Sequence, residues 1–329
     1  LFLLWWFYDN INIKRKWAII LTNQAIGHSH AKIILMGEHS VVYGQPAIAL
    51  PVPKIDLNVR IIEKENGIYI NSKYFIGNLN NVPNDLLGIK NLIDSTLSKL
   101  HKEDASFEMI IDSSIPSERG MGSSAATSVA IVKALFHYFN VNIDKELLLD
   151  LSNVEETITH GNPSGLDTAT AGSDNPVWFI RNETLNEINF NLNAVLVIAD
   201  SGIKGRTDIA INYVKQQLNN NKEDTMKSIK HIGDLVTRAK FDIENNNPIE
   251  LGKLMTENQK ELKKLKVSND KIDELVEIAN RNGSLGTKLT GSGLGGCIIA
   301  LARNINEAQS IENALLKAGA LDTWIQPFE

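Results

Sequence analysis

Residues 115–126 read Ile-Pro-Ser-Glu-Arg-Gly-Met-Gly-Ser-Ser-Ala-Ala, a turn opened by proline and punctuated by glycine that runs directly into an apolar segment with helical spacing. Gly120 and Gly122 allow the backbone to bend tightly and to approach a ligand closely. Ser123 and Ser124 stand at the start of a helix predicted over 124–138, where backbone N–H groups and the helix dipole favour negative charge. The stretch therefore indicates a phosphate cradle, although an ordinary serine-capped helix start has the same local pattern.

Bulk composition limits the classes of protein to consider. The chain has 329 residues, 43% of them hydrophobic, which is enough for one large domain or two of ordinary size. Its net charge is −6 and its basic residues do not cluster, so nucleic acid is not expected as a partner. The single cysteine, Cys297, excludes disulfides within the chain and cysteine metal clusters, and it favours a reducing compartment. It opens a predicted strand and no basic partner is evident in the sequence, which indicates a small buried residue rather than a nucleophile.

The first residues of the chain form an apolar segment, LFLLWWFY at 1–8. It is far shorter than the roughly 20 residues that span a bilayer, and the basic residues 14–16 follow it rather than precede it, which opposes a secretory signal. We expect residues 1–20 to be an extension outside the folded core, the protein to be cytoplasmic, and no membrane partner. The alternative is a short anchor at a membrane surface.

Hydrophobic periodicity predicts the remaining elements. A strand over 32–36 is expected to break at 37–40 and to resume over 41–44, and alternation over 55–76 predicts a hairpin that turns near 65–67. Asp144 is expected to cap a helix that stops at Gly161-Asn162-Pro163. The other expected elements are helices at 86–101, 124–138, 206–219, 223–246, 249–264, 268–282 and 305–318, and strands at 107–111, 177–180, 194–200 and 297–302, with a last strand at the end of the chain.

Two glycine segments, 120–125 and 291–296, match the pattern G-x-G-x-x-G/A of dinucleotide-binding proteins. That motif needs a strand ending at its first glycine, a helix after its last, and an acidic residue that closes a second strand. The first segment follows a polar connector and has only helix downstream, and the second runs into the predicted strand 297–302. Both fail this test. His28 and His30 are spaced like metal ligands, but no further cluster completes a zinc site.

Three segments, residues 32–44, 116–126 and 288–297, resemble in the right order the three signature motifs of the GHMP small-molecule kinases. Within that superfamily, Glu-His-Ser-Val-Val-Tyr-Gly at 38–44 and His-Gly-Asn-Pro-Ser-Gly-Leu-Asp at 160–167 most resemble the mevalonate kinases. The resemblance extends from about residue 29 to the end of the chain. One departure is that Ser29-His30-Ala31 precede Lys32, where the family commonly has Pro-Gly.

The resemblance implies a two-domain α+β fold. An N-terminal ATP-binding domain over 21–190, like domain 2 of ribosomal protein S5, would precede a helix-rich C-terminal domain over 191–329. The implied reaction is phosphorylation of (R)-mevalonate to 5-phosphomevalonate with ATP and Mg²⁺, and a homodimer is compatible with it. The alternatives are phosphomevalonate kinase or another kinase of the superfamily, and a catalytically silent metabolite sensor. The joint presence of Lys32, Ser124, Glu156 and Asp167 argues against the sensor.

Phosphoryl transfer needs positioned phosphates, neutralised charge and an oriented hydroxyl, and the resemblance implies residues for each task. Asp167 would be the general base or would orient the hydroxyl, and Lys32 would stabilise charge on the transferring group. Ser124 and Glu156 would share Mg²⁺, which prefers oxygen ligands. The implied nucleotide-binding residues are Pro116, Arg119, Gly120, Met121, Gly122, Ser123, Ser124, Ala125 and Ala126, and the implied substrate residues are Glu38, His39, Gly291, Ser292 and Gly293.

Each of these side chains also has an ordinary structural interpretation. Without the resemblance, Lys32 would be a surface lysine at a strand edge, Glu156 a solvated helix residue and Asp167 a helix cap. His39 fits a structural histidine as well as it fits a substrate ligand. The loop over 290–296 is expected to pack against the phosphate loop.

Overall fold

The computed structural model describes residues 25–160, 165–181, 183 and 186–328, and for residues 156 and 158–160 it describes the backbone alone. The apolar segment 1–20 and the predicted helix stop at 161–163 lie outside the described residues. The chain divides into two compact units, which both draw on separated stretches of sequence. Of the described residues, the first unit comprises those up to Ser29 and those within Leu57–Ser113 and Thr127–Thr159. The second comprises those within His30–Asp56, Ser114–Ala126 and His160–Glu329. The predicted domain boundary after residue 190 stays a prediction.

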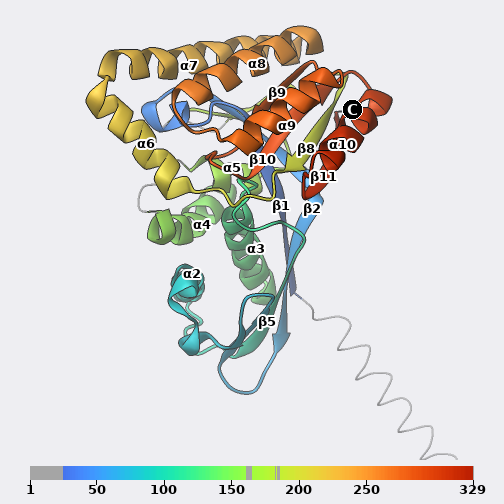
Figure 1. The fold of residues 1–329 in the computed structure, drawn as a ribbon. Coiled ribbons are helices and arrows are strands. Elements are labelled where there is room, and N and C mark those ends of the chain that lie inside the picture. Colours follow the sequence, from blue (N-terminus) through green and yellow to red (C-terminus); the bar gives the residue numbers. More distant parts are fainter. Residues whose placement is uncertain (1–24, 161–164, 182, 184–185, 329) are drawn as a thin grey trace, which may run out of the picture. The chain divides into compact units, whose positions relative to one another are not determined.

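Within the described residues, the first unit combines part of a sheet with α-helices (Figure 1). Its strands are the start of β1 (Ala25–Met36), the second half of β2 (Ala47–Glu63), β3 (Ile68–Ser72), β4 (Ile76–Asn78) and β5 (Phe107–Ser113). Its α-helices are α2 (Leu87–Leu100) and most of α3 (Ser123–Tyr138) and α4 (Lys145–His160). Alternate residues of β2 are fully buried because side chains of a strand point to opposite faces in turn. The Asp144 carboxylate accepts a hydrogen bond from the Leu147 amide at 2.8 Å, which confirms the predicted cap of α4.

The predicted hairpin over 55–76 is wrong. β5 lies between β2 and β3: it pairs antiparallel with β2, with Val59 opposite Ile111, and parallel with β3, with Ile70 opposite Met109. The alternation of buried residues fixes which face of a strand is buried, but it does not fix the neighbouring strand. The turn near Gly67 is present, yet the Gly67 carbonyl accepts from the amide of Phe107, the first residue of β5.

The second unit contains an antiparallel sheet with the strand order β11-β8-β10-β9. These strands are β8 (Ala194–Asp200), β9 (Gly286–Leu289), β10 (Cys297–Ala302) and β11 (Asp322–Phe328). Every residue of β8 and β10 is buried, and helices α9 (Asp270–Arg281) and α10 (Ile305–Lys317) pack against this sheet (Figure 1). The unit also contains the first half of β2, paired with β6 (Val177–Phe179), which in turn pairs with β7 (Asn186–Glu187).

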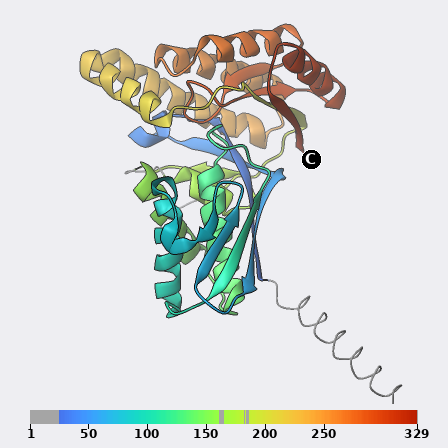
Figure 2. The same ribbon diagram turned by 60° about the horizontal axis from the view of Figure 1, so that its bottom comes forward.

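Three longer helices complete the second unit, α6 (Thr207–Asn220), α7 (Lys222–Glu244) and α8 (Pro248–Lys264). Helices α7 and α8 lie side by side, as two views show (Figures 1 and 2). Their bounds agree with the sequence predictions to within about two residues. Asparagines account for several helix starts: the side chains of Asn269 and Asn304 accept from the amides of Ile272 and Glu307. Within the described residues, no helix has the length and apolar character needed to cross a membrane.

The expected return strand at 41–44 is instead a 3-10 helix, η1 (Ser40–Tyr43). The Val41 amide donates to the Gly37 carbonyl at 3.2 Å, and the Ser40 hydroxyl donates to the same carbonyl at 3.2 Å. These local bonds fold the chain back immediately after β1 (Ala25–Met36), and Gly44 ends the turn in a left-handed conformation. The pair Val41-Val42 predicted a strand because β-branched residues favour strands. Strand propensity takes no account of the local hydrogen bonds that form the turn.

Candidate active site

The phosphate loop, residues 116–122, reaches helix α3 through two glycines in left-handed conformation. Gly120 has φ 74° and Gly122 has φ 72°, which L-residues with a side chain adopt only with strain. Helix α3 begins at Ser123, and the Ala126 amide donates to the Gly122 carbonyl at 2.9 Å. Met121 and Ala125 are buried and anchor the loop. The positive end of the helix dipole is therefore presented at Ser123, as an anion cradle requires.

Strand β1 places Lys32 directly beneath this loop. The Lys32 amide donates to the Met121 carbonyl at 3.0 Å, so strand and loop are joined by their backbones. A Cβ atom added at Gly122 would lie 2.7 Å from Lys32 Cγ and 2.8 Å from Lys32 Cε. Glycine at 122 is thus needed for two reasons, its φ angle and the close approach of the lysine side chain.

Lys32 and Asp167 form an ion pair, with 2.6 Å between Nζ and Oδ1. The Lys32 side chain is 2% exposed, so it is not a surface lysine, whereas the Asp167 side chain is 34% exposed. Asp167 lies in the first turn of α5 (Leu166–Ala171), whose N-cap is Gly165 with φ 83°, so Asp167 is not the cap of this helix. The buried ammonium holds one carboxylate oxygen, while part of the carboxylate faces open space.

The second glycine segment, 291–296, packs against the phosphate loop, as expected. A Cβ atom added at Gly291 would lie 2.8 Å from the Cα of Gly120, so the two backbones touch. The Thr290 hydroxyl donates to the Ile34 carbonyl at 2.9 Å and accepts from the Ile34 amide at 3.0 Å. All three sequence motifs therefore meet within the second unit.

Glu38 is fully buried and forms an ion pair with Lys288, which is equally buried. The Asn258 amide donates to the second carboxylate oxygen of Glu38 at 3.3 Å, and Lys288 also donates to the Leu289 carbonyl at 2.5 Å. Burial raises the pKa of Glu38, an effect that Lys288 opposes, and burial lowers the pKa of Lys288. The substrate role implied for Glu38 stays a prediction. Sequence reasoning missed Lys288 as its partner, although Lys288 opens the third motif.

His39 contacts the third motif. Its Nε2 lies 2.8 Å from the Ser292 carbonyl, and because a carbonyl only accepts, Nε2 carries the hydrogen. Burial lowers the pKa of His39, which favours the neutral imidazole. His39 has φ 59°, a left-handed value imposed by the tight turn before η1. The structure thus brings together two residues implied to face the substrate, His39 and Ser292.

The two implied Mg²⁺ ligands belong to different units, Ser124 to the second and Glu156 to the first. Ser124 lies in the first turn of α3. Glu156 lies in α4, and its side chain is outside the described part of the chain. Among the described residues, no three His, Cys, Asp or Glu side chains are grouped to hold a metal ion. The hydroxyl and carboxylate of this pair are nevertheless the hard oxygen donors that Mg²⁺ prefers.

Comparison with known proteins identifies the family. Residues 89–174 match the N-terminal domain of the GHMP kinases, and residues 240–321 match their C-terminal domain. A mevalonate kinase of Pyrococcus furiosus is 30% identical over 322 residues, which cover 90% of this chain and 94% of that protein. A mevalonate kinase of Methanocaldococcus jannaschii is 32% identical over 311 residues, covering 87% and 93% respectively.

Solved structures agree with this assignment. The crystal structure of the Methanococcus jannaschii mevalonate kinase superposes with a TM-score of 0.82 at 29% identity, covering 94% of this chain and 99% of that one. The mevalonate kinase of methicillin-resistant Staphylococcus aureus gives a TM-score of 0.70 at 33% identity, covering 93% and 99%. The expected α+β GHMP kinase fold is confirmed, and the chain belongs to the mevalonate kinases of the GHMP kinase family.

Proposed function

We propose that this chain transfers the γ-phosphoryl group of ATP to the 5-hydroxyl of (R)-mevalonate, giving ADP and 5-phosphomevalonate. The observation that carries the proposal is the Lys32–Asp167 ion pair, which adjoins a glycine loop that opens a helix in a chain homologous to mevalonate kinases. In this reaction the bond between the 5-oxygen and the γ-phosphorus forms and the bond from that phosphorus to the β,γ-bridging oxygen breaks. The hydroxyl proton leaves to a base.

The phosphate loop binds the nucleotide in this proposal. Its backbone at 120–124 and the start of α3 face the β- and γ-phosphates, whose negative charge matches the positive end of the helix dipole. Because the loop is held from below by Lys32, its conformation is set before ATP arrives. A preorganised site of this kind does not spend binding energy on ordering itself.

Asp167 is the group that acts on the acceptor. Its partly exposed carboxylate receives the proton of the 5-hydroxyl or aligns the hydroxyl for in-line attack. Lys32 holds the carboxylate in place through Oδ1, and its charge stabilises the negative charge that develops on the transferring group.

Mg²⁺ accompanies ATP in this proposal. The Ser124 hydroxyl and the Glu156 carboxylate would hold it, and it would neutralise charge on the β- and γ-phosphates. We assign the acceptor side to Glu38, His39, Gly291, Ser292 and Gly293. The contact of His39 with the Ser292 carbonyl supports the grouping of these two residues.

A coupled ADP-release assay tests the acceptor. Purified protein with Mg²⁺ and ATP would be offered mevalonate, phosphomevalonate, homoserine and galactose in parallel. We expect mevalonate to be phosphorylated far faster than the other three. Comparable turnover of any rival acceptor, or ADP release that no acceptor stimulates, would overturn the assignment.

A further inference from the structure

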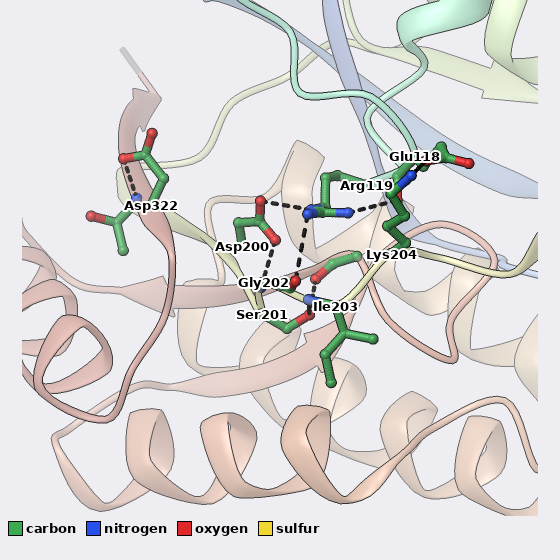
Figure 3. Close-up of polar contacts among 10 residues, drawn as sticks. Glu118, Arg119, Asp200, Ser201, Gly202, Ile203, Lys204 and Asp322 are labelled. Carbon is green, nitrogen blue, oxygen red and sulfur yellow. Dashed lines mark hydrogen bonds and ion pairs between the residues drawn. The ribbon is translucent and has the colours of Figure 1, made fainter.

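The Arg119 side chain, from the phosphate loop, is directed to the end of strand β8. Its Nε donates to Asp200 Oδ2 at 2.8 Å, and Figure 3 shows the guanidinium lying against the Asp200 carboxylate. The Arg119 side chain is 12% exposed and that of Asp200 only 2%. A buried, charge-assisted hydrogen bond of this kind is stronger and more directional than an exposed ion pair.

Asp200 is itself held rigidly. Its second oxygen, Oδ1, accepts from the Gly202 amide at 2.8 Å, and its backbone carbonyl accepts from the Leu321 amide at 2.8 Å. Asp200 is paired with Cys297 of β10 on one side and with Asp322 of β11 on the other. The neighbouring strands therefore hold the backbone of Asp200, and the Gly202 amide holds its carboxylate.

Backbone bonds join the same loop to that sheet and to the segment that follows β8. The Cys297 amide donates to the Arg119 carbonyl at 3.2 Å, and the Gly205 amide donates to the Glu118 carbonyl at 2.7 Å. A Cβ atom added at Gly296 would lie 2.7 Å from the Arg119 carbonyl oxygen, so glycine at 296 allows this contact. Gly120 and Gly122 give the loop conformational freedom. Contacts made by Arg119, the residue just before Gly120, restrict that freedom.

We propose that Arg119 and Asp200 are a pair of positioning residues, which fix the phosphate loop for ATP, and that the Arg119 side chain acts through Asp200 rather than on the nucleotide phosphates. This role differs from the direct nucleotide contact that the family resemblance implies for Arg119. It rests on the proposed function only in taking the loop to be the ATP site.

The test compares Arg119→Met, Asp200→Asn and the double variant by equilibrium titration with ATP, which needs no acceptor. In Asp200→Asn one of the two bonds to Arg119 and Gly202 is lost, because an amide has a single acceptor oxygen and a carboxylate has two. We expect each single variant to weaken ATP binding by about tenfold, as loss of a charge-assisted bond predicts. The double variant should bind ATP no more weakly than the single variant with the lower ATP affinity.

A direct phosphate contact by Arg119 predicts a different pattern. Arg119→Met would then lose much more affinity than Asp200→Asn, and that outcome would overturn the proposal, as would additive losses or unchanged ATP binding in both single variants. If a single variant fails to fold because it leaves a buried charge unpaired, the double variant decides, since it carries neither charge. Wild-type ATP affinity in the double variant would likewise overturn the proposal.

The matched control is the ion pair between Lys204 and Glu118, the neighbour of Arg119 in the phosphate loop; these side chains are 71% and 56% exposed. Lys204→Met should leave ATP affinity unchanged. Because the titration does not involve mevalonate, a wrong acceptor assignment would leave these results intact, so the two proposals fail separately.

Discussion

The Lys32 ammonium lies 2.6 Å from Asp167 Oδ1, and it reaches that carboxylate from strand β1 while Asp167 projects from the first turn of α5. The two ends of this contact differ in exposure, 2% for the lysine side chain and 34% for the aspartate. The buried lysine holds its partner and contacts the phosphate loop, whereas the aspartate retains an exposed face for a ligand. From this difference in exposure we infer that Lys32 positions the carboxylate and that Asp167 contacts the substrate.

Replacement of Asp167 by asparagine tests that assignment. Asparagine keeps the volume of the side chain but neither takes a proton nor supplies negative charge, so kcat should fall by roughly 10²–10⁴. ATP affinity, measured by titration, should hardly change. Asp174→Asn, at an exposed position shortly after α5, is the control and should keep wild-type kcat. A kcat near the wild-type value in Asp167→Asn would make this aspartate a structural residue.

Gly122→Ala tests the close contact between the phosphate loop and Lys32. The new Cβ would need space 2.7 Å from Lys32 Cγ, so the lysine must move and kcat should fall by at least tenfold. Gly44→Ala is a matched control: Gly44 has a similar φ of 78°, but an added Cβ there has no neighbour within 4 Å. Both variants should lose about 1 kcal/mol of stability from the strained φ. Equal kcat in the two variants would show that the steric contact with Lys32 is irrelevant.

The helices of the second unit were predictable because their apolar spacing and asparagine caps are local signals. The order of the strands could not be predicted from the sequence. Alternation of apolar residues does not show whether β3 or β5 pairs with β2. The three glycine and charge motifs identified the family. The contacts between the three motifs could not be predicted either, because they join residues far apart in the sequence. Glu38 and Lys288 lie 250 residues apart, and nothing in their spacing predicts an ion pair.

Lys288→Met tests the buried ion pair with Glu38. The variant leaves a carboxyl group buried without its cation, which should reduce the free energy of unfolding by about 3–5 kcal/mol at neutral pH. The double variant Glu38→Gln/Lys288→Met should recover part of that loss. Urea denaturation measures both. Arg303→Met is the control, since it breaks an exposed pair with Glu307 and should change stability by about 1 kcal/mol or less.

The pH dependence of Lys288→Met follows from the same pair. Burial raises the pKa of Glu38, and without Lys288 nothing of comparable strength opposes that rise. A folded-state pKa above the unfolded value means that the folded state binds more protons, so this contribution is full below the unfolded pKa and is lost as pH rises through the folded pKa. Relative to wild type, the variant should therefore lose less stability at pH 5 than at pH 8. A loss that is the same at both pH values would contradict a buried, titrating Glu38.

The contribution of His39 to stability changes with pH in the opposite direction. Burial lowers its pKa in the folded state, so the unfolded chain binds the extra proton as pH falls below about 6.5, and stability falls with it. For one histidine the slope reaches at most about 1.4 kcal/mol per pH unit. We expect the free energy of unfolding to decrease between pH 7.5 and 5.5 more steeply in the wild type than in His39→Asn.

Asparagine is the suitable replacement because it tolerates the positive φ at this position and its amide also donates hydrogen bonds, yet it does not titrate. His101→Asn, at another histidine with positive φ but with an exposed side chain, is the control for the histidine-to-asparagine change. Parallel curves for wild type and His39→Asn would mean that His39 takes up its proton as readily in the folded protein as in the unfolded chain.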